Sequence, residues 1–339
     1  MTDDQGEDEP VVYVTREIPD AGLDLIEAET DMNVWDGKLP PEKNHIIERL
    51  EELEADGLLC LLTDETDGEV MDASPNLDVV STFSVGYDHV DVEAAMERDL
   101  AVGHTPGVLS ETTADFAWAM LMTTARRTVE GNEYVLDDEW ETWGPKLLTG
   151  PDVHGATLGI VGLGNIGSTV ARRAAGFDMD VLYTDAEPQP DVEADLAEYG
   201  VDVEFVDKAD LLERSDFVTL HVPLMGATHH YIGEDELRAM KDSAVLVNTS
   251  RGPVVDTEAL DRALEEGWIE RAGLDVTDPE PLPGDHEITR HVPEKLVVTP
   301  HIASASIGTR DKMARMAAEN LLAGLKGEEL PNSAIEDWQ

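Results

Sequence analysis

A glycine-rich segment near the middle of the chain constrains the fold more than any other feature. It reads Val-Gly-Leu-Gly-Asn-Ile-Gly over residues 161–167, and an acid, Asp185, ends the next apolar run. A strand-like run (157–161) precedes the segment and a helix-compatible run (166–176) follows it. In this pattern the first glycine permits a tight turn, the second lets the backbone approach a pyrophosphate, and the third allows close helix–sheet packing. The segment therefore predicts a βαβ unit that binds a dinucleotide.

The residues expected to hold the dinucleotide come from this segment and from the acid that follows the next strand. The N–H groups at the start of the helix would face the phosphates. Asp185 can accept hydrogen bonds from both ribose hydroxyls of NAD(H), and it would repel the 2′-phosphate of NADP(H). The cofactor is thus expected to be NAD(H), with NADP(H) disfavoured. The predicted contacts in the glycine-rich segment are Gly162, Gly164, Asn165, Ile166 and Gly167.

Length and composition indicate a two-domain protein of a reducing compartment. The chain has 339 residues, of which 41% are apolar, enough for two hydrophobic cores. No apolar run reaches the ~20 residues of a membrane-spanning helix, and residues 1–10 are too acidic and polar for a signal peptide. The single cysteine, Cys60, excludes an intrachain disulfide, and its leucine neighbours predict a buried thiol. We expect a cytoplasmic protein with no metal site.

The net charge restricts the possible partners. The chain carries 74 Asp and Glu residues against 23 Lys and Arg, a formal charge of −51. Such a field repels nucleic acids and anionic membranes, so neither is expected as a partner. An acidic surface could serve a partner protein. Molar salt, in which the Debye length is roughly 3 Å, explains better why the acids are spread over the whole chain.

Strand-like and helix-like runs alternate in two series along the chain, which predicts two parallel-sheet α/β domains. One series fills the first hundred residues, and the other begins at residue 157. We expect two Rossmann-like doubly wound domains with a cleft between them, of which the first is flavodoxin-like. The expected substrate domain comprises residues 1–109 and 302–339, and the expected NAD-binding domain comprises residues 110–301.

Three residues that each follow a strand-like run carry candidate chemistry: Arg251, Glu280 and His301. A nicotinamide enzyme acting on a hydroxy acid needs a cation for the carboxylate and an acid/base for the hydroxyl proton. The arginine fork suits the first task, and histidine suits the second. A carboxylate beside the histidine would orient it and favour its protonated form. Taken singly, each residue also has an ordinary structural explanation. Arg251 fits a surface ion pair, Glu280 fits a solvated loop acid, and His301 fits a turn.

The segments 248–256, 273–276 and 299–302 resemble the D-isomer-specific 2-hydroxyacid dehydrogenases. The resemblance spans roughly residues 10–330, and the motifs occur in the order typical of that family. It implies that Arg251 binds the substrate carboxylate, that His301 is the acid/base, and that Glu280 orients the histidine.

Four further segments resemble the glyoxylate/hydroxypyruvate reductase branch: 59–64, 84–88, 105–109 and 139–143. The branch implies a homodimeric enzyme that reduces glyoxylate or hydroxypyruvate to the D-2-hydroxy acid. It places Trp143 on a dimerisation arm around residues 128–155, reaching the partner's pocket or packing in the interface. The implied substrate-binding residues are Leu62, Val85 and Gly86, and the implied cofactor contacts are Thr113, Pro223, Thr249 and Asp275.

Two rival functions stay open. Phosphoglycerate dehydrogenase would require additional basic residues in the first domain, whose N-terminal part, residues 1–109, offers only Arg16, Lys38, Lys43, Arg49 and Arg98. An NAD-sensing regulatory protein, like the related transcriptional corepressors, keeps the arginine, glutamate and histidine. Such proteins need peptide-binding surfaces and disordered extensions, which this sequence offers only at its N-terminus. Formate oxidation is disfavoured because the formate-oxidising subgroup of the family shows a similar pattern but lacks the glutamate of the Glu–His pair.

Overall fold

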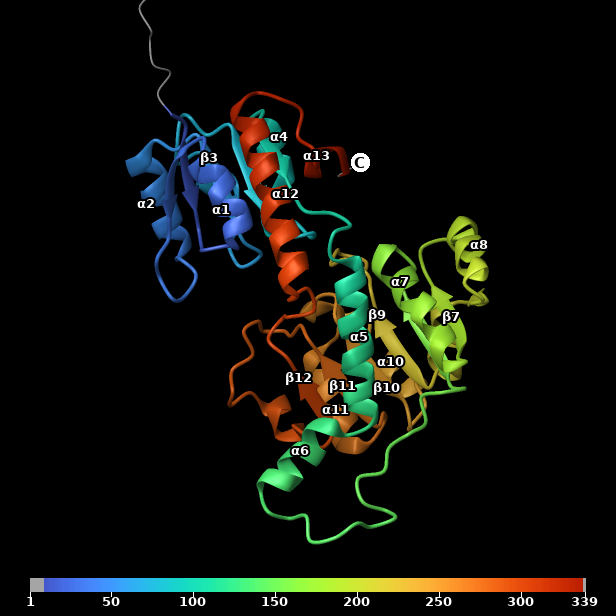
Figure 1. Cartoon of the computed structure of the whole chain (residues 1–339). Coiled ribbons are helices and arrows are strands. Elements are labelled where there is room, and N and C mark those ends of the chain that lie inside the picture. The colour runs from blue at the N-terminus through green and yellow to red at the C-terminus, as the bar shows by residue number, and fades with distance from the viewer. Residues whose placement is uncertain (1–8, 338–339) are drawn as a thin grey trace, which may run out of the picture. The chain divides into compact units, whose positions relative to one another are not determined.

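The computed structural model describes residues 9–337, which divide into two compact units. The first unit ends at Leu109 and resumes at Ala305, and the second is Ser110–Ser304 (Figure 1). Among the described residues, no helix combines the length and apolarity needed to cross a bilayer. Residues 1–8, which carry most of the segment used to argue against a signal peptide, lie outside the described residues.

The first unit contains a five-stranded parallel sheet of order β2-β1-β3-β4-β5, the flavodoxin-like order. Its helices cover both faces, with α2, α3 and α4 on one side and α1 and α12 on the other. The strands are β1 (Val11–Val14), β2 (Asp31–Val34), β3 (Gly57–Cys60), β4 (Val79–Thr82) and β5 (Ala101–Gly103). The helices are α1 (Asp20–Glu27), α2 (Lys43–Leu53), α3 (Gly68–Met71), α4 (Val92–Glu97), α12 (Ile307–Leu325) and α13 (Ala334–Asp337).

Cys60 is the last residue of β3 and is fully buried, as predicted from its leucine neighbours. Burial raises the pKa of its thiol to about 12, so the side chain is not a nucleophile at neutral pH. The strand ends here because the buried Asp64 carboxylate accepts hydrogen bonds from the Leu61 N–H (2.8 Å) and the Thr15 hydroxyl (2.5 Å). These bonds turn the chain away from the sheet.

The second unit contains a seven-stranded parallel sheet of order β12-β11-β10-β9-β6-β7-β8. Counted from β6, this is the Rossmann order with one strand added, which confirms the predicted fold class. The strands are β6 (Thr157–Val161), β7 (Asp180–Thr184), β8 (Val203–Phe205), β9 (Phe217–Leu220), β10 (Val245–Asn248), β11 (Arg271–Leu274) and β12 (Leu296–Val298). The α-helices are α5 (Ser110–Ala125), α6 (Thr128–Leu136), α7 (Asn165–Ala174), α8 (Pro190–Glu198), α9 (Lys208–Arg214), α10 (Glu234–Ala239) and α11 (Thr257–Glu266). The 3₁₀-helices are η1 (Ala175–Phe177), η2 (Gly252–Val254) and η3 (Glu287–His291).

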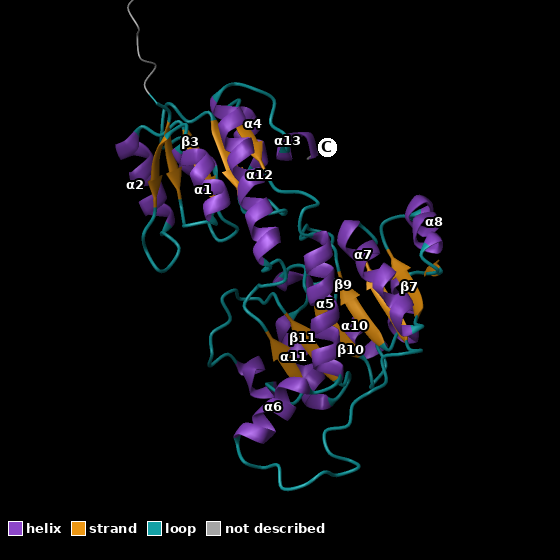
Figure 2. Ribbon diagram, in the orientation of Figure 1, coloured by secondary structure: helices purple, strands orange, loops and turns teal. Residues whose placement is uncertain are grey.

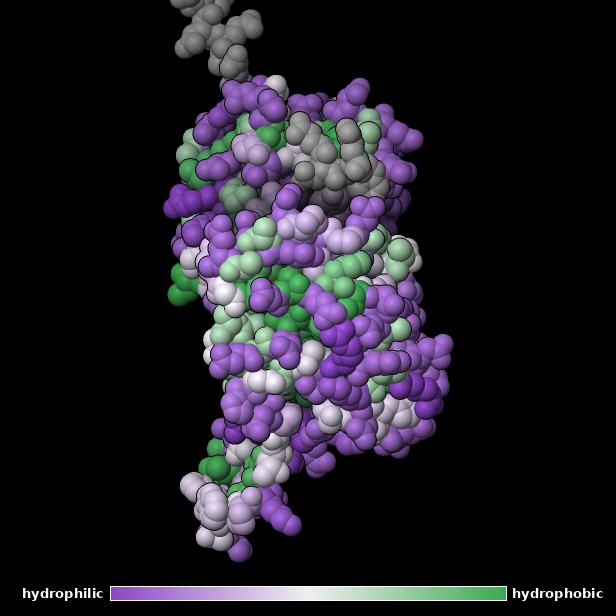
Figure 3. Space-filling model, turned by 90° about the vertical axis from the view of Figure 1, so that its right-hand side faces the viewer, coloured by the Kyte–Doolittle hydropathy of each residue, from purple (hydrophilic) through white to green (hydrophobic). Residues whose placement is uncertain are grey.

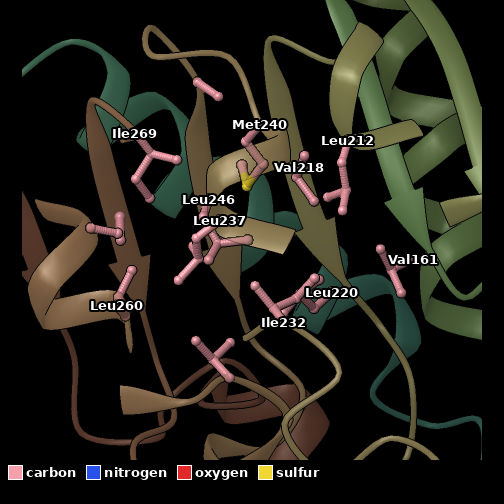
Figure 4. Close-up of a cluster of buried hydrophobic side chains, with 14 of the residues drawn as sticks. Val161, Leu212, Val218, Leu220, Ile232, Leu237, Met240, Leu246, Leu260 and Ile269 are labelled. Carbon is pink, nitrogen blue, oxygen red and sulfur yellow. The ribbon is translucent and has the colours of Figure 1, made fainter. Parts of the chain in front are cut away.

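Both faces of this second sheet are buried, so its strands are apolar throughout rather than alternating with polar residues. In β10, Leu246 joins the cluster under α9, α10 and α11, whereas Val245 and Val247 join the cluster under α5, α7 and α8. Figure 4 shows Leu246 beside Leu237 and Met240 in the first cluster. Figure 2 shows helices and strands alternating in both units, as a doubly wound fold requires.

The surface is mainly hydrophilic on the face drawn in Figure 3, consistent with the high content of acids. An exception lies on α6 and the segment that follows it. Leu136 is 75% exposed, Trp140 60% and Trp143 77%. Large apolar side chains this exposed are uncommon on a surface that is otherwise charged.

Candidate active site

The glycine-rich turn lies between β6 and α7, at the carboxyl edge of the second sheet. Gly162 has φ +92°, a backbone conformation that residues with a side chain rarely adopt. A Cβ there would lie 2.8 Å from the carbonyl oxygen of His221. A Cβ on Gly167 would overlap the carbonyl oxygen of Gly162. Gly164, by contrast, faces open space. The turn therefore leaves room for a ligand at the start of α7, where backbone N–H groups lack helical partners.

Asp185 follows β7 and contacts this same turn. Its Oδ2 atom accepts a hydrogen bond from the Leu163 N–H (2.8 Å), and its Oδ1 accepts one from the Ala186 N–H (2.7 Å). Each carboxylate oxygen can accept a second hydrogen bond, so ribose hydroxyls remain possible donors. The bond to Leu163, which sequence reasoning missed, couples the acid to the shape of the glycine-rich turn.

The remaining residues predicted to contact the cofactor lie in this same unit. Thr113 is buried in the first turn of α5, and Pro223 follows β9, the strand next to β6. Thr249 follows β10, and its buried hydroxyl has no hydrogen-bond partner among the described residues. A buried hydroxyl without a partner is costly unless a ligand completes it. This orphan hydroxyl and the open space at Gly164 fit a bound dinucleotide.

Three adjacent strands, β10, β11 and β12, bring Arg251, Glu280 and His301 to one edge of the sheet. The Nδ1 atom of His301 donates to Oε1 of Glu280 at 2.6 Å. The other glutamate oxygen accepts a long hydrogen bond from the Thr277 N–H (3.4 Å). With Nδ1 committed to the glutamate, the Nε2 atom of His301 is left to exchange a proton with a substrate.

Burial raises the pKa of Glu280, whereas the hydrogen bond and the charge of His301 lower it. Together with the Thr277 N–H and the positive charge of Arg251, they hold the pKa of Glu280 below its usual value. The glutamate is therefore ionised at neutral pH. Its carboxylate accepts the Nδ1–H of His301 and so fixes the orientation of the imidazole.

The Arg251 loop is shaped by two residues that sequence reasoning did not single out. Asn248 is fully buried; its Oδ1 accepts from the Ser250 N–H (3.0 Å), and its Nδ2 donates to the Arg251 carbonyl (2.8 Å). A Cβ on Gly252 would overlap the carbonyl oxygen of Thr277. The backbone after Arg251 thus packs directly on the loop that leads to Glu280.

Asp275 holds the loop that carries His301. Its buried carboxylate accepts hydrogen bonds from the Thr299 hydroxyl (2.6 Å), the Ile302 N–H (2.9 Å) and the Ala303 N–H (2.8 Å). Its carbonyl oxygen accepts the His301 N–H (2.8 Å). His301 itself has φ +54°, a strained value for a residue other than glycine. This set of bonds is a means of maintaining that conformation.

Comparison with known proteins agrees with this geometry. The family model described as D-isomer specific 2-hydroxyacid dehydrogenase, NAD binding domain, matches residues 118–303. A glyoxylate reductase of Korarchaeum cryptofilum is 52% identical over 95% of each chain. The chain belongs to the D-isomer specific 2-hydroxyacid dehydrogenase family. It is an NAD(P)-dependent oxidoreductase.

Solved structures show the same fold in relatives of this dehydrogenase. A protein of Thermus thermophilus has a TM-score of 0.87 and 46% identity, with 96% of this chain and 99% of that chain covered. An NADPH-dependent glyoxylate/hydroxypyruvate reductase of Sinorhizobium meliloti, solved with NADP and malonate, has a TM-score of 0.82 and 28% identity, with 97% of each chain covered.

A second histidine of the nucleotide-binding unit can be set aside as the acid/base of this dehydrogenase. Burial lowers the pKa of His221 to about 3, so its imidazole is neutral at pH 7. Its Nε2 atom lies 2.9 Å from the Thr219 hydroxyl. His301, which is ion-paired and partly exposed, is the better candidate for proton exchange.

Three of the other predicted substrate-binding residues belong to the first unit of the dehydrogenase. Leu62 lies in the turn after β3, and Val85 and Gly86 lie in the turn after β4. Trp143 lies in the second unit, in the irregular segment that follows α6. The structure therefore brings Arg251, Glu280 and His301 together on one edge of the second sheet. The other predicted substrate-binding residues do not lie on that edge.

Proposed function

We propose that this dehydrogenase reduces a small 2-oxo acid, glyoxylate or hydroxypyruvate, to the D-2-hydroxy acid with NADH. The observation that carries the proposal is the His301–Glu280 hydrogen bond on the same sheet edge as Arg251. The names of the Korarchaeum and Sinorhizobium relatives support this substrate class.

In the proposed reaction, the guanidinium of Arg251 binds the substrate carboxylate through two parallel hydrogen bonds. The Nε2–H of His301 donates its proton to the carbonyl oxygen as that oxygen gains charge, while Glu280 stabilises the imidazolium beforehand. Bound reduced nicotinamide supplies the hydride that adds to the carbonyl carbon. One hydride and one proton convert the 2-oxo group to a 2-hydroxyl group.

We assign the remaining contacts on their positions in the fold. Leu62, Val85 and Gly86 would bind the substrate, in part through backbone N–H groups. The cofactor contacts would be the glycine-rich turn (162–167), Asp185, Thr113, Pro223, Thr249 and Asp275. Asp275 already accepts three hydrogen bonds from protein donors, so its contact with the cofactor would have to add to these.

A substrate panel tests the proposed function. Glyoxylate, hydroxypyruvate, pyruvate and phosphohydroxypyruvate would each be assayed with NADH and with NADPH, in molar KCl and in low salt. Highest kcat/KM on glyoxylate or hydroxypyruvate supports the proposal, and highest kcat/KM on the phosphorylated acid would favour phosphoglycerate dehydrogenase instead. Greater activity in molar KCl would support our further proposal of a cytoplasmic enzyme adapted to high salt, which rests on the charge of −51.

Replacing Arg251 by lysine should weaken binding of the 2-oxo acid, because an ammonium cannot reproduce the two-pronged contact of a guanidinium. We expect kcat/KM to fall by the equivalent of roughly 2–3 kcal/mol, mainly through a higher KM. The KM for NADH serves as the internal control and should stay the same. An unchanged kcat/KM for glyoxylate would remove Arg251 from the substrate site.

Asp185 should make the enzyme prefer NADH, because its carboxylate would lie against a 2′-phosphate. The double change Asp185→Ser, Ala186→Arg should move the kcat/KM preference toward NADPH, measured at one fixed KCl concentration because salt screens the repulsion. Asp185→Asn is the matched control: it keeps an oxygen for the Leu163 N–H while removing the charge. If the unaltered protein prefers NADPH, other residues select the cofactor.

We further propose that the exposed apolar segment around residues 128–155 forms a homodimer interface, with Trp143 reaching the partner. The double change Leu136→Glu, Trp140→Glu should convert the dimer to a monomer by light scattering, because burying the new charges is unfavourable. Leu39→Glu, at a side chain 76% exposed on the first unit, is the control and should leave the mass unchanged. A monomeric parent protein would contradict the proposal.

A further inference from the structure

The turn after β4 holds three successive carbonyl groups in fixed directions. The Ser84 carbonyl accepts the Thr105 N–H at 2.8 Å, and the Gly86 carbonyl accepts the Ser84 hydroxyl at 2.6 Å. Between them, the Val85 carbonyl oxygen lies 2.9 Å from Nδ1 of His104. Because a carbonyl oxygen carries no hydrogen, His104 must be the donor in this last contact.

Fixing these carbonyls also fixes the N–H groups that follow them. In a planar trans peptide the N–H points opposite to the C=O of the preceding residue. The Val85 N–H therefore points away from Thr105, and the Gly86 N–H points away from His104. Within residues 9–337, neither N–H donates to a protein acceptor. Both residues are partly exposed, so the two donors can reach a ligand from outside the unit.

His104 is itself firmly anchored. Its side chain and backbone are 3% exposed, and its ring meets the Tyr87 ring edge-on at 5.2 Å between centroids. The His104 carbonyl accepts from Nδ2 of the fully buried Asn320, and its N–H donates to the Asn332 carbonyl. A donor anchored on both sides can hold the Val85 peptide in one orientation.

We propose that His104 is a positioning residue for substrate binding: its Nδ1–H holds the Val85 carbonyl, so that the Gly86 N–H faces the substrate carboxylate. Adjacent N–H groups held in this way suit an anionic oxygen. The inference rests on the proposed function, which assigns the Val85 and Gly86 N–H groups to the substrate. It adds a residue that touches neither substrate nor cofactor and acts only through the loop.

Two replacements separate the hydrogen bond from packing. His104→Asn retains an N–H donor at the position of Nδ1, whereas His104→Leu has similar bulk but no donor. Both remove the ring contact with Tyr87. His45→Leu, which removes a partly buried ring packed at a tilt against Trp35 in the same unit, is the control.

We expect His104→Leu to raise the KM for the 2-oxo acid about tenfold, the effect of losing one hydrogen bond to a buried group. The values of kcat and of KM for NADH should stay unchanged, because the carboxylate is bound equally in ground and transition states. The KM of His104→Asn and of His45→Leu for the 2-oxo acid should stay within about twofold of the parent value. Equal KM increases in the asparagine and leucine variants, or no increase in the leucine variant, would overturn the proposal.

Hydrogen exchange at the Thr105 amide gives a readout independent of activity, because this N–H bonds to the Ser84 carbonyl of the same loop. Exchange should be faster in His104→Leu than in His104→Asn or the parent. Faster exchange in His104→Leu, combined with a parent enzyme that reduces none of the 2-oxo acids, would mean that His104 positions the loop but that the assigned substrate is wrong. If exchange is equal in the two variants, His104 does not hold the loop.

Discussion

Replacing His301 by alanine should lower kcat for 2-oxo acid reduction by roughly 10²–10⁴-fold, because proton donation to the carbonyl oxygen is lost. The dissociation constant of NADH, measured by fluorescence titration, should change little, because the proposed cofactor contacts do not include His301. His154→Ala, which removes an exposed imidazole from the same unit, is the matched control and should keep full activity. A His301→Ala enzyme with near-normal kcat would eliminate this residue as the acid.

The hydrogen bond between His301 and Glu280 leads to a second prediction for proton donation to the carbonyl oxygen. Reduction requires the protonated imidazole, and an ionised partner 2.6 Å away favours that form. Glu280→Gln should therefore cause the reduction rate to decline at a lower pH than in the parent enzyme. The pH–rate profile of kcat/KM measures this shift. Profiles that coincide would argue that the hydrogen bond does not influence the proton donor.

Gly252→Ala should damage both the site and the stability of the second unit. The added Cβ would overlap the Thr277 carbonyl oxygen, which is backbone and cannot rotate aside. Overpacking of this kind costs about 1–3 kcal/mol. The Arg251 loop and the Glu280 loop would have to separate, and a displacement of about 1 Å at a reacting group can reduce the rate about 10²-fold. We expect a lower Tm and a kcat/KM reduced by about that factor.

Gly284→Ala is the control for this substitution. Gly284 lies in the same loop region, beyond Glu280, and a Cβ there would meet no neighbouring atom. Its Tm and kcat/KM should match those of the parent. A Gly252→Ala protein with normal kcat/KM would mean that the close approach of the two loops is not needed for catalysis.

Local sequence patterns were sufficient for the architecture of this protein and for its principal candidates. The strand-like runs before Arg251, Glu280 and His301 are apolar because both faces of a parallel sheet are buried, so their position in the chain is visible in the sequence. Parallel strands place their carboxyl ends on one edge, and this topological rule predicted the meeting of the three residues. The glycine spacing of residues 162–167 likewise predicted the tight turn between β6 and α7, where Gly162 has a positive φ.

Some elements lacked such a signal. The strand β2 (Asp31–Val34) has only two apolar residues, none of its residues is fully buried, and the sequence did not indicate it. The short helix α6 was hidden in the segment 128–155, because no residue of that helix is buried and no apolar face is defined. In both cases the structure forms at the surface, where hydrophobic periodicity is weak.

The sequence by itself determined the fold class, the glycine-rich turn between β6 and α7, and the chemical types of the candidate residues, because each depends on a local pattern. Only the tertiary structure decided how those residues are held. The three donors to Asp275, the Asp185 bond to Leu163 and the His104 bond to Val85 join residues 19 or more positions apart. Such contacts depend on where separate strands end in space, and the local sequence around one residue does not indicate which distant residue it will contact.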